Sequence, residues 1–293
     1  MDERDWIMLK TIADEKSITK TAEKLYISQP AITYRLRAME NEFKCKIVFR
    51  TSNGVMLTPQ GEFLLSHVRE MILKLTKTKE RVQSISGKVS GPLRIGSSAI
   101  FAAFILPDLL QGFLEKYPEV EIFLNTGRSR EVTKMLGSEE VSVAIVRGDY
   151  PWKEKRLFLR EENICLVSCA RLEIEELPEK PRIIYSTDSS LQKMVDDWWH
   201  ETFFKPSYVS MAVDTMDICR RMVKKNLGWA ILPDIGMSEL GGIHKTDLYW
   251  KDGKPVARRT WLYCHNYSLE LPAVTAFIAY LEENISMIQE KYS

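Results

Sequence analysis

Long hydrophobic runs are absent from this sequence of 293 residues, and its first residues are charged. The longest apolar run, Ala99 to Leu106, is far too short to cross a bilayer. The N-terminal stretch MDERDW lacks the apolar core of a signal peptide. We therefore expect a soluble, cytoplasmic protein with no membrane partner. The hydrophobic fraction of 45% and the charged fraction of 28% are typical of a globular protein with a packed core.

Cysteine and histidine are too few and too scattered to predict a disulfide framework or a metal centre. The four histidines lie far apart, and the five cysteines form no C-x-x-C pair. The sequence also lacks a Walker loop, a G-x-G-x-x-G motif after a strand and an H-E-x-x-H motif. We therefore expect no metal, no cofactor and no enzymatic activity. The cysteines, expected to be reduced thiols, are Cys45, Cys165, Cys169, Cys219 and Cys264.

A formal net charge of +1 hides an uneven distribution of charge along the chain. Residues 1–90 carry 16 Lys and Arg against 11 Asp and Glu, whereas residues 91–293 carry 25 against 29. A basic first part suits contact with a polyanion such as DNA. The second part is expected to have another task.

The first residues predict two short helices. Trp6, Leu9, Ile12 and Ala13 recur at helical spacing, which predicts a helix that ends near the polar stretch DEKS. Ser17 is suited to cap the next helix, because its hydroxyl can accept an unpaired backbone N–H. A break of three residues, YIS, follows.

A third helix is expected to begin after the cap Ser28, with Pro30 in its first turn. An apolar stripe, predicted to pack on the other helices, contains Ile32, Leu36, Met39 and Phe43. The opposite face begins beside Gln29 and contains Pro30, Thr33, Tyr34, Arg37 and Asn41. Such a polar, partly basic face is typical of a recognition helix in the major groove. The same pattern also fits an ordinary amphipathic helix in a small three-helix domain.

The segment Lys44 to Gly61 favours the first interpretation. It alternates like two short strands around TSNG, and Asn-Gly is a strong hairpin signal. A hairpin here makes the domain a winged helix-turn-helix. Arg50 and the hairpin tip are then placed to contact backbone phosphates.

The stretch from Ser17 to Leu65 resembles the LysR-type transcriptional regulators. The shared motifs are the S-I-T-x-x-A-E-x-L start, the S-Q-P-A turn, the VFR ending and the L-T-P-x-G link. The resemblance implies base and backbone contacts from Gln29, Pro30 and Thr33, and a wing contact from Arg50. Tyr34 departs from the family, in which many members have arginine. The expected DNA-binding residues are Ser28, Gln29, Pro30, Thr33, Tyr34, Arg37 and Arg50.

A long helix is predicted between Gly61 and Gly87, where neither glycine nor proline interrupts the chain. Its apolar positions alternate by four and three, as in a coiled coil that pairs two chains. A helix packed on its own chain is the alternative; the family resemblance favours the dimer. The predicted seam is Leu64, Val68, Met71, Leu75, Thr78, Val82 and Ile85, widened by Leu65, Ile72 and Leu73. The stretch from Ser86 to Pro92 is expected to be a hinge.

Strand-like and helix-like segments alternate in the last two hundred residues, which predicts an α/β domain. Their order predicts two lobes joined by crossing strands, and resembles the periplasmic-binding-protein-like effector domain of the same family. We expect a winged helix-turn-helix at 1–60, a dimerisation helix and hinge at 61–90, and an effector domain at 91–293. Lobe I is expected at about 91–163 and 267–293, and lobe II at about 168–262.

Residues at strand ends are the expected effector site, because ligands of such domains lie at the carboxyl ends of strands. An anion suits the stretch IGSSAI, where a strand turns into a helix. Alternation lets only one of Arg258 and Arg259 face the cleft; Pro-x-x-Arg, shared with one branch of the family, favours Arg258. The candidates are Ser97, Ser98, Ile100, Thr126, Arg147, Thr215 and Arg258.

That branch is the citrate-sensing, catabolite-control branch, which this sequence resembles in IG-x-SS and in RG after the third strand. An arginine at each end of a cleft, with Ser98 between them, would favour a ligand with two or more carboxylates. We therefore expect a homodimeric or homotetrameric regulator that binds a double-stranded DNA operator and a small anionic effector such as citrate. The alternative is a solute-binding or ligand-sensing protein without sequence-specific DNA binding.

Overall fold

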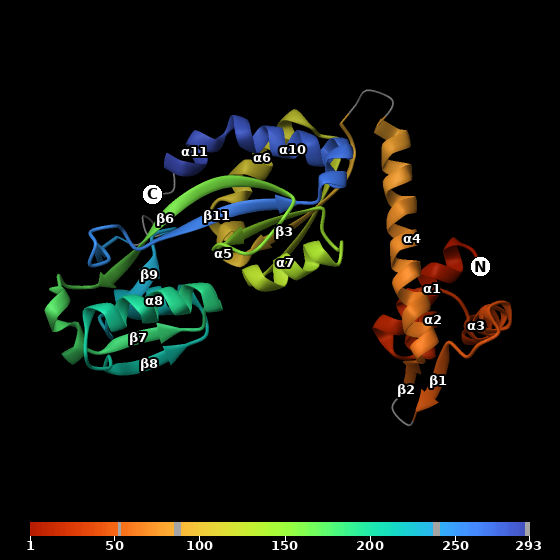
Figure 1. Cartoon of the computed structure of the whole chain (residues 1–293), viewed down its shortest axis with the longest axis horizontal. Helices are drawn as coiled ribbons and strands as arrows, with labels where there is room; N and C mark the ends of the chain where they lie inside the picture. Colours follow the sequence, from red (N-terminus) through yellow and green to blue (C-terminus); the bar gives the residue numbers. More distant parts are fainter. Residues whose placement is uncertain (52–53, 85–88, 237–240, 291–293) are drawn as a thin grey trace. The chain divides into compact units, whose positions relative to one another are not determined.

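The structure is a computed structural model that describes residues 1–51, 54–84, 89–236 and 241–290. It divides into two compact units, Met1–Gln83 and Ser84–Ser293. In Figure 1 the first unit, drawn in red to orange, is mostly helical, and the second contains a twisted sheet with helices on it. Across these residues, every helix is either too short or too polar to cross a membrane.

The first unit has the predicted winged helix-turn-helix order. The Ser17 hydroxyl caps α2 by accepting the Lys20 N–H at 3.3 Å, and Ser28 caps α3 by accepting the Ala31 N–H at 3.4 Å. The two strands pair antiparallel, with Thr51 opposite Gly54; Ser52 and Asn53 lie outside the described residues. The elements are α1 (Glu3–Glu15), α2 (Ile18–Lys24), α3 (Gln29–Phe43), β1 (Val48–Thr51), β2 (Gly54–Leu57) and α4 (Pro59–Ser84).

The predicted apolar stripe of α3 is buried except at its end. Ile32, Leu36 and Met39 belong to the core of the first unit. Phe43 was expected to continue the stripe, but 45% of it is exposed. The reason is local: α3 ends at Phe43, and Lys44 takes the left-handed conformation with φ of 51°. The chain therefore turns away before Phe43 reaches the core.

A close contact explains the glycine of the L-T-P-x-G motif. A Cβ on Gly61 would lie 2.1 Å from the backbone oxygen of Ile47, so no larger residue fits. Thr58 fixes the same junction, since its hydroxyl donates to the Lys46 carbonyl at 2.6 Å and accepts the Gly61 N–H at 3.0 Å. The start of α4 is thereby held against the strand side of the wing.

The first half of α4 packs on its own unit, which corrects the predicted dimer seam. Val68 is 1% exposed and Leu65 is 3% exposed, and both belong to the core that α1 and α3 share. Further along, 47% of Met71 and 62% of Val82 are exposed. Ile85, the last residue of the predicted seam, lies outside the described residues. The helical period is present, but its first turns are covered by the chain itself.

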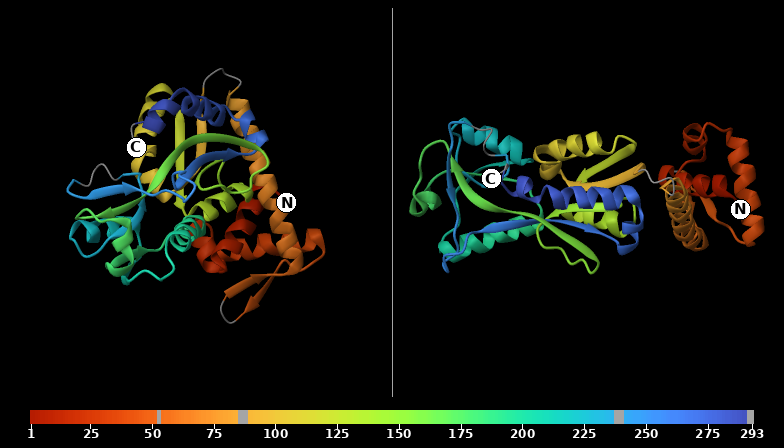
Figure 2. Two further views of the ribbon diagram at one scale, coloured as in Figure 1. Left: turned by 60° about the vertical axis from the view of Figure 1, so that its left-hand side comes forward. Right: turned by 90° about the horizontal axis from the view of Figure 1, so that it is seen from above.

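The second unit has the predicted two-lobed α/β fold. Among the described residues, its main sheet has seven strands in the order β10-β6-β11-β5-β3-β4, with β9 also paired to β6. In lobe I, β3 lies parallel to both β4 and β5, and α7 covers one face (Figure 2). The lobe I elements are β3 (Gly91–Ser98), α5 (Ala99–Phe104), α6 (Leu106–Lys116), β4 (Val120–Gly127), α7 (Ser129–Gly137), β5 (Val143–Arg147), η2 (Asn266–Glu270), α10 (Pro272–Glu283) and α11 (Ile285–Glu290).

Lobe II contains a second, parallel strand pair and its own aromatic core. Strand β7 pairs with β8, and Trp198, Trp199 and Trp229 pack beneath them in one cluster. Its elements are η1 (Ile174–Glu179), β7 (Arg182–Tyr185), α8 (Ser189–Thr202), β8 (Val209–Val213), α9 (Met216–Lys224), β9 (Ala230–Pro233) and β10 (His244–Asp247). Strand β10 was not predicted, because HKTD has no apolar alternation.

Two strands run through both lobes. β6 (Lys155–Ser168) and β11 (Ala257–Cys264) pair antiparallel, with a register shift between Thr260 and Trp261. The sequence pattern predicts strands only at 164–168 and 260–264, the ends of β6 and β11, because charged residues interrupt the apolar pattern of β6. β3 also begins earlier than expected, so Gly91 and Pro92 belong to it and not to a hinge; residues 85–88 lie outside the described part.

Candidate functional site

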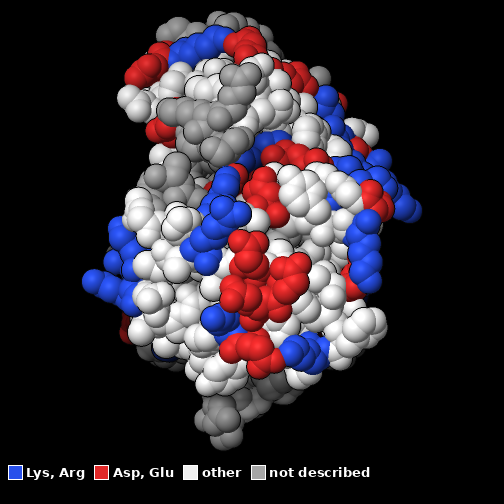
Figure 3. Space-filling model, turned by 90° about the vertical axis from the view of Figure 1, so that its left-hand side faces the viewer, with Lys and Arg blue, Asp and Glu red and all other residues white. Residues whose placement is uncertain are grey.

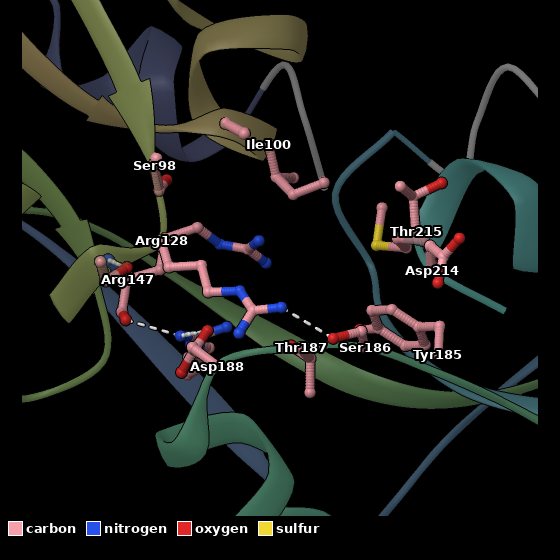
Figure 4. Close-up of a pocket in the computed structure, with 15 residues that line it drawn as sticks. Ser98, Ile100, Arg128, Arg147, Tyr185, Ser186, Thr187, Asp188, Asp214 and Thr215 are labelled. Carbon is pink, nitrogen blue, oxygen red and sulfur yellow. Dashed lines mark hydrogen bonds and ion pairs between the residues drawn. The ribbon is translucent and has the colours of Figure 1, made fainter. Parts of the chain in front are cut away.

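A pocket of about 330 Å³ lies between the two lobes of the second unit (Figure 4). Strand ends and helix starts from both lobes form its wall. Of the expected effector residues, Ser98, Ile100, Arg147, Thr215 and Arg258 line it. The other lining residues are Ala99, Gly127, Arg128, Ser129, Tyr185, Ser186, Thr187, Asp188, Asp214 and Met216.

Ser97 and Thr126 do not line the pocket, which corrects two expectations. Ser97 is completely buried, and its hydroxyl donates to the backbone oxygen of Ser98 at 3.2 Å. Thr126 is exposed in β4, and the chain reaches the pocket only at Gly127 and Arg128. Side chains alternate along a strand, so Ser97 next to Ser98, and Thr126 next to Gly127, point away from the cleft.

Helices α7, α8 and α9 all begin at the pocket, and their N-cap residues Arg128, Asp188 and Thr215 line it. The first N–H groups of a helix have no partner within the helix and carry a partial positive charge. Asp188 already accepts the N–H groups of Ser190 and Leu191, and Thr215 accepts that of Ile218. These N–H groups are thus already bonded, and what the helix starts add to the pocket is the partial positive charge of their dipoles.

Ser98 adds an unused polar group. Only 5% of the residue is exposed, and within the described structure its hydroxyl oxygen has no hydrogen-bond partner. A buried hydroxyl without a partner costs free energy, so such a group in a pocket wall points to a ligand. Tyr185 offers another donor, because burial raises the pKa of its hydroxyl to about 12 and keeps it protonated at neutral pH.

Arg147 is buried and already paired. Its side chain is 4% exposed, and its Nε and Nη2 both donate to Oε1 of Glu162, a side chain with no exposure. The N–H of Arg147 is also used, since it donates to the Ser129 hydroxyl at 2.9 Å. Arg147 therefore lines the pocket with a guanidinium group that is already bonded to a carboxylate.

Arg258, rather than Arg259, turns toward the pocket. Arg258 is 2% exposed, and its Nη2 donates to Asp188 at 2.5 Å and to the Arg147 carbonyl at 2.6 Å. Burial and the nearby Arg147 lower the pKa of the Arg258 guanidinium. Arg259 is exposed and pairs with Glu161. Arg147 and Arg258, two of the three arginines that line the pocket, thus lie side by side and not one at each end, as was expected.

Arg128 was missed by the sequence reasoning. It extends from lobe I across the pocket, where its Nη2 donates to the hydroxyl of Ser186 in lobe II at 2.7 Å (Figure 4). Ser186, Thr187 and Asp188 follow β7 directly and were missed as well. The strand-end rule that selected Ser98 applies equally to these residues and could have found them.

The proposed reading face of α3 is open to solvent. Gln29, Pro30, Tyr34 and Arg37 are exposed, with 76% of Tyr34 accessible, whereas Thr33 is half-buried. The Ser28 hydroxyl is used as the helix cap, and the Thr33 hydroxyl donates to the Gln29 carbonyl at 3.1 Å. Arg50 lies in β1 opposite Val55, and its side chain lies outside the described part.

Figure 3 presents one face of the second unit. Acidic and basic side chains are interspersed there, with a group of acidic residues near the centre. Among the described residues, no group of histidine, cysteine, aspartate and glutamate is arranged to hold a metal ion.

Known protein families match both units. The model for the bacterial regulatory helix-turn-helix protein of the lysR family matches residues 4–62, and the model for the LysR substrate binding domain matches residues 86–286. The chain belongs to the LysR family. This LysR-family chain is a DNA-binding transcriptional regulator with a substrate-binding domain, and not an enzyme.

Relatives and solved structures agree over nearly the whole chain. HTH-type regulators of Bacillus subtilis (strain 168) are similar: YraN is 40% identical over 96% of this chain and 98% of its own, and YkuM is 31% identical over 94% and 95%. CbnR in complex with its target DNA has a TM-score of 0.69 at 17% identity, covering 97% of this chain and 99% of CbnR. A full-length variant of OxyR from Pseudomonas aeruginosa has a TM-score of 0.66 at 17% identity, covering 100% and 98%. At these identities the structures show the shared LysR fold.

Proposed function

We propose that this LysR regulator reads a double-stranded DNA operator with α3 and responds to a small anionic effector in the pocket between its lobes. The buried, unpartnered hydroxyl of Ser98 carries the effector part of the proposal, because it lies in a pocket where helices begin. Carboxylate oxygens accept hydrogen bonds from a hydroxyl, and the positive ends of the helix dipoles favour their charge. The exposed polar face of α3 supports the DNA part.

Citrate and related di- and tricarboxylates are the first candidate effectors, on the strength of the sequence resemblance to the citrate-sensing branch. We assign DNA contact to residues 1–60, dimerisation to 61–90 and effector binding to 91–293, in a cytoplasmic homodimer or homotetramer. The exposed Met71 and Val82 mark the face of α4 that is open to a second copy. Two paired recognition helices then read the two halves of an operator.

Replacing Ser98 with alanine should weaken effector binding. The variant loses one hydrogen bond to a charged ligand, which is worth about 1.5–3 kcal/mol, so its Kd rises roughly 10- to 150-fold. The measurement is a thermal-shift titration of the full chain with citrate and related acids, followed by calorimetry, because a ligand of the native pocket raises Tm by mass action. Thr126→Ala, on an exposed strand end outside the pocket, is the matched control and should bind as the parent does. If no di- or tricarboxylate raises the Tm of the parent protein, these effectors are excluded.

Replacing Gln29 with alanine should reduce sequence preference more than overall affinity. A side-chain amide that reads a base edge contributes about 1–3 kcal/mol of discrimination. Arg37→Ala, on the same exposed face, should instead weaken binding to all sequences. It should also reduce the slope of log K against the logarithm of the salt concentration by about one. Operators selected from random duplexes, compared with scrambled DNA at several salt concentrations, provide the measurement. An equal loss for Gln29→Ala on both kinds of DNA would contradict base reading.

A further inference from the structure

The pocket lining in the described residues includes three arginines with different partners. Arg147 pairs with Glu162 and Arg258 with Asp188, so both guanidinium groups face carboxylates. Arg128 instead donates to a neutral hydroxyl, that of Ser186. Its charge is therefore the least compensated of the three.

We propose that Arg128 holds the carboxylate of the effector and that this carboxylate displaces the Ser186 hydroxyl from its guanidinium. The proposal rests on the anionic effector proposed above and names the residue that binds its charge. A carboxylate accepts two parallel hydrogen bonds from a guanidinium, and such charge-assisted bonds are about twice as strong as bonds to a neutral acceptor. The exchange of Ser186 for a carboxylate is therefore favourable.

Arg147 and Arg258 are poor alternatives for the same task. The Glu162 side chain has no exposure, and that of Asp188 is 12% exposed. A ligand that drew either arginine away would leave a buried carboxylate without its cation, which is strongly unfavourable. Arg128 is exposed, so it can turn toward a ligand at little cost.

The position of Arg128 also links binding to the relation between the lobes. Its backbone N–H donates to Glu131 at the start of α7 in lobe I, whereas its side chain reaches Ser186 after β7 in lobe II (Figure 4). An effector carboxylate on Arg128 therefore replaces a direct bond between the lobes with one that passes through the ligand. The hydroxyl of Ser98, also in lobe I, lies in the same pocket wall as a second donor.

Calorimetry on the full chain tests the proposal, with citrate, succinate and acetate as probes. Arg128→Gln should weaken binding of every probe that binds the parent by at least tenfold, and Arg128→Lys should weaken it less, because lysine keeps the charge but not the paired donors. Ser186→Ala removes the competing acceptor and should tighten binding about two- to tenfold. Arg130→Gln, a neighbouring arginine that does not line the pocket, is the control.

The outcomes separate this proposal from the one on which it rests. If the parent binds no probe, both the carboxylate effector and the role of Arg128 are overturned. If the parent binds and Arg128→Gln binds equally well, only the role of Arg128 is overturned. If Ser186→Ala weakens binding as strongly as Arg128→Gln, Ser186 is itself a ligand contact and the displacement is wrong. Tm values without probe check that each variant is folded.

Discussion

Glu162→Ala should lower the free energy of unfolding of the effector unit by about 3–5 kcal/mol. Glu162 is the fully buried partner of Arg147, and its removal leaves a guanidinium in the interior without a counter-charge. Arg160 and Arg258, which are 1% and 2% exposed on the neighbouring strand positions, add further positive charge nearby. The carboxylate thus compensates more than one cation, which makes its loss costly.

Urea unfolding of the full chain, followed by tryptophan fluorescence, measures this effect. Six of the seven tryptophans lie beyond residue 84, so the signal reports chiefly on the effector unit. Glu161→Ala is the matched control on the same strand: it breaks only the exposed pair with Arg259 and should cost less than about 1 kcal/mol. A similar small loss for both variants would show that the buried pair is not needed for stability.

Val68→Asp should unfold the DNA-binding unit instead of producing a folded monomer. Val68 is 1% exposed in the core of that unit, and an unpaired carboxylate there costs more than about 4 kcal/mol. Met71→Asp places the same side chain one turn further along α4, where 47% of the residue is exposed. It should leave the unit folded, with a change of at most about 0.5 kcal/mol in its free energy of unfolding. It should also weaken pairing with a second copy.

Circular dichroism and sedimentation of the full-length variants separate the two effects. Val68→Asp should lose helical signal and DNA binding together, whereas Met71→Asp should keep its helical signal and sediment as a smaller species. A folded Val68→Asp protein that sediments as a monomer would restore the seam predicted from the sequence. A Met71→Asp protein with unchanged sedimentation would remove this face of α4 from the dimer.

Local signals were enough to predict the helix-turn-helix and the α/β order of the second unit. Ser17 and Ser28 cap helices because capping depends on the nearest three residues. The strands of the wing likewise pair on either side of the position where the sequence predicts a turn, with Thr51 opposite Gly54. The apolar positions of α4 do recur with the spacing of a heptad. A period shows that one face of a helix is apolar, but it does not show whether the chain itself or a second copy covers that face.

The site was predicted only in part, because its charges are arranged by tertiary contacts. Ser98, Arg147 and Arg258, selected because they lie at strand ends, line the pocket. Their partners Glu162 and Asp188 come from β6 and from the start of α8, which no local pattern connects with them. Arg128 was missed because it is an arginine at the N-cap of α7, where arginine is not a usual cap.

The strands β6 and β11, shared by both lobes, determine what kind of motion an effector can cause. They are hydrogen-bonded to each other over most of their length, from Ala257 opposite Asn163 to Cys264 opposite Lys155. A rotation of one lobe against the other must therefore twist these two paired strands together, and the hydrogen bonds between them oppose the twist. Glu162 in β6 pairs with Arg147, and Arg258 in β11 pairs with Asp188. A small twist of the two strands therefore moves buried charges that are screened little by water.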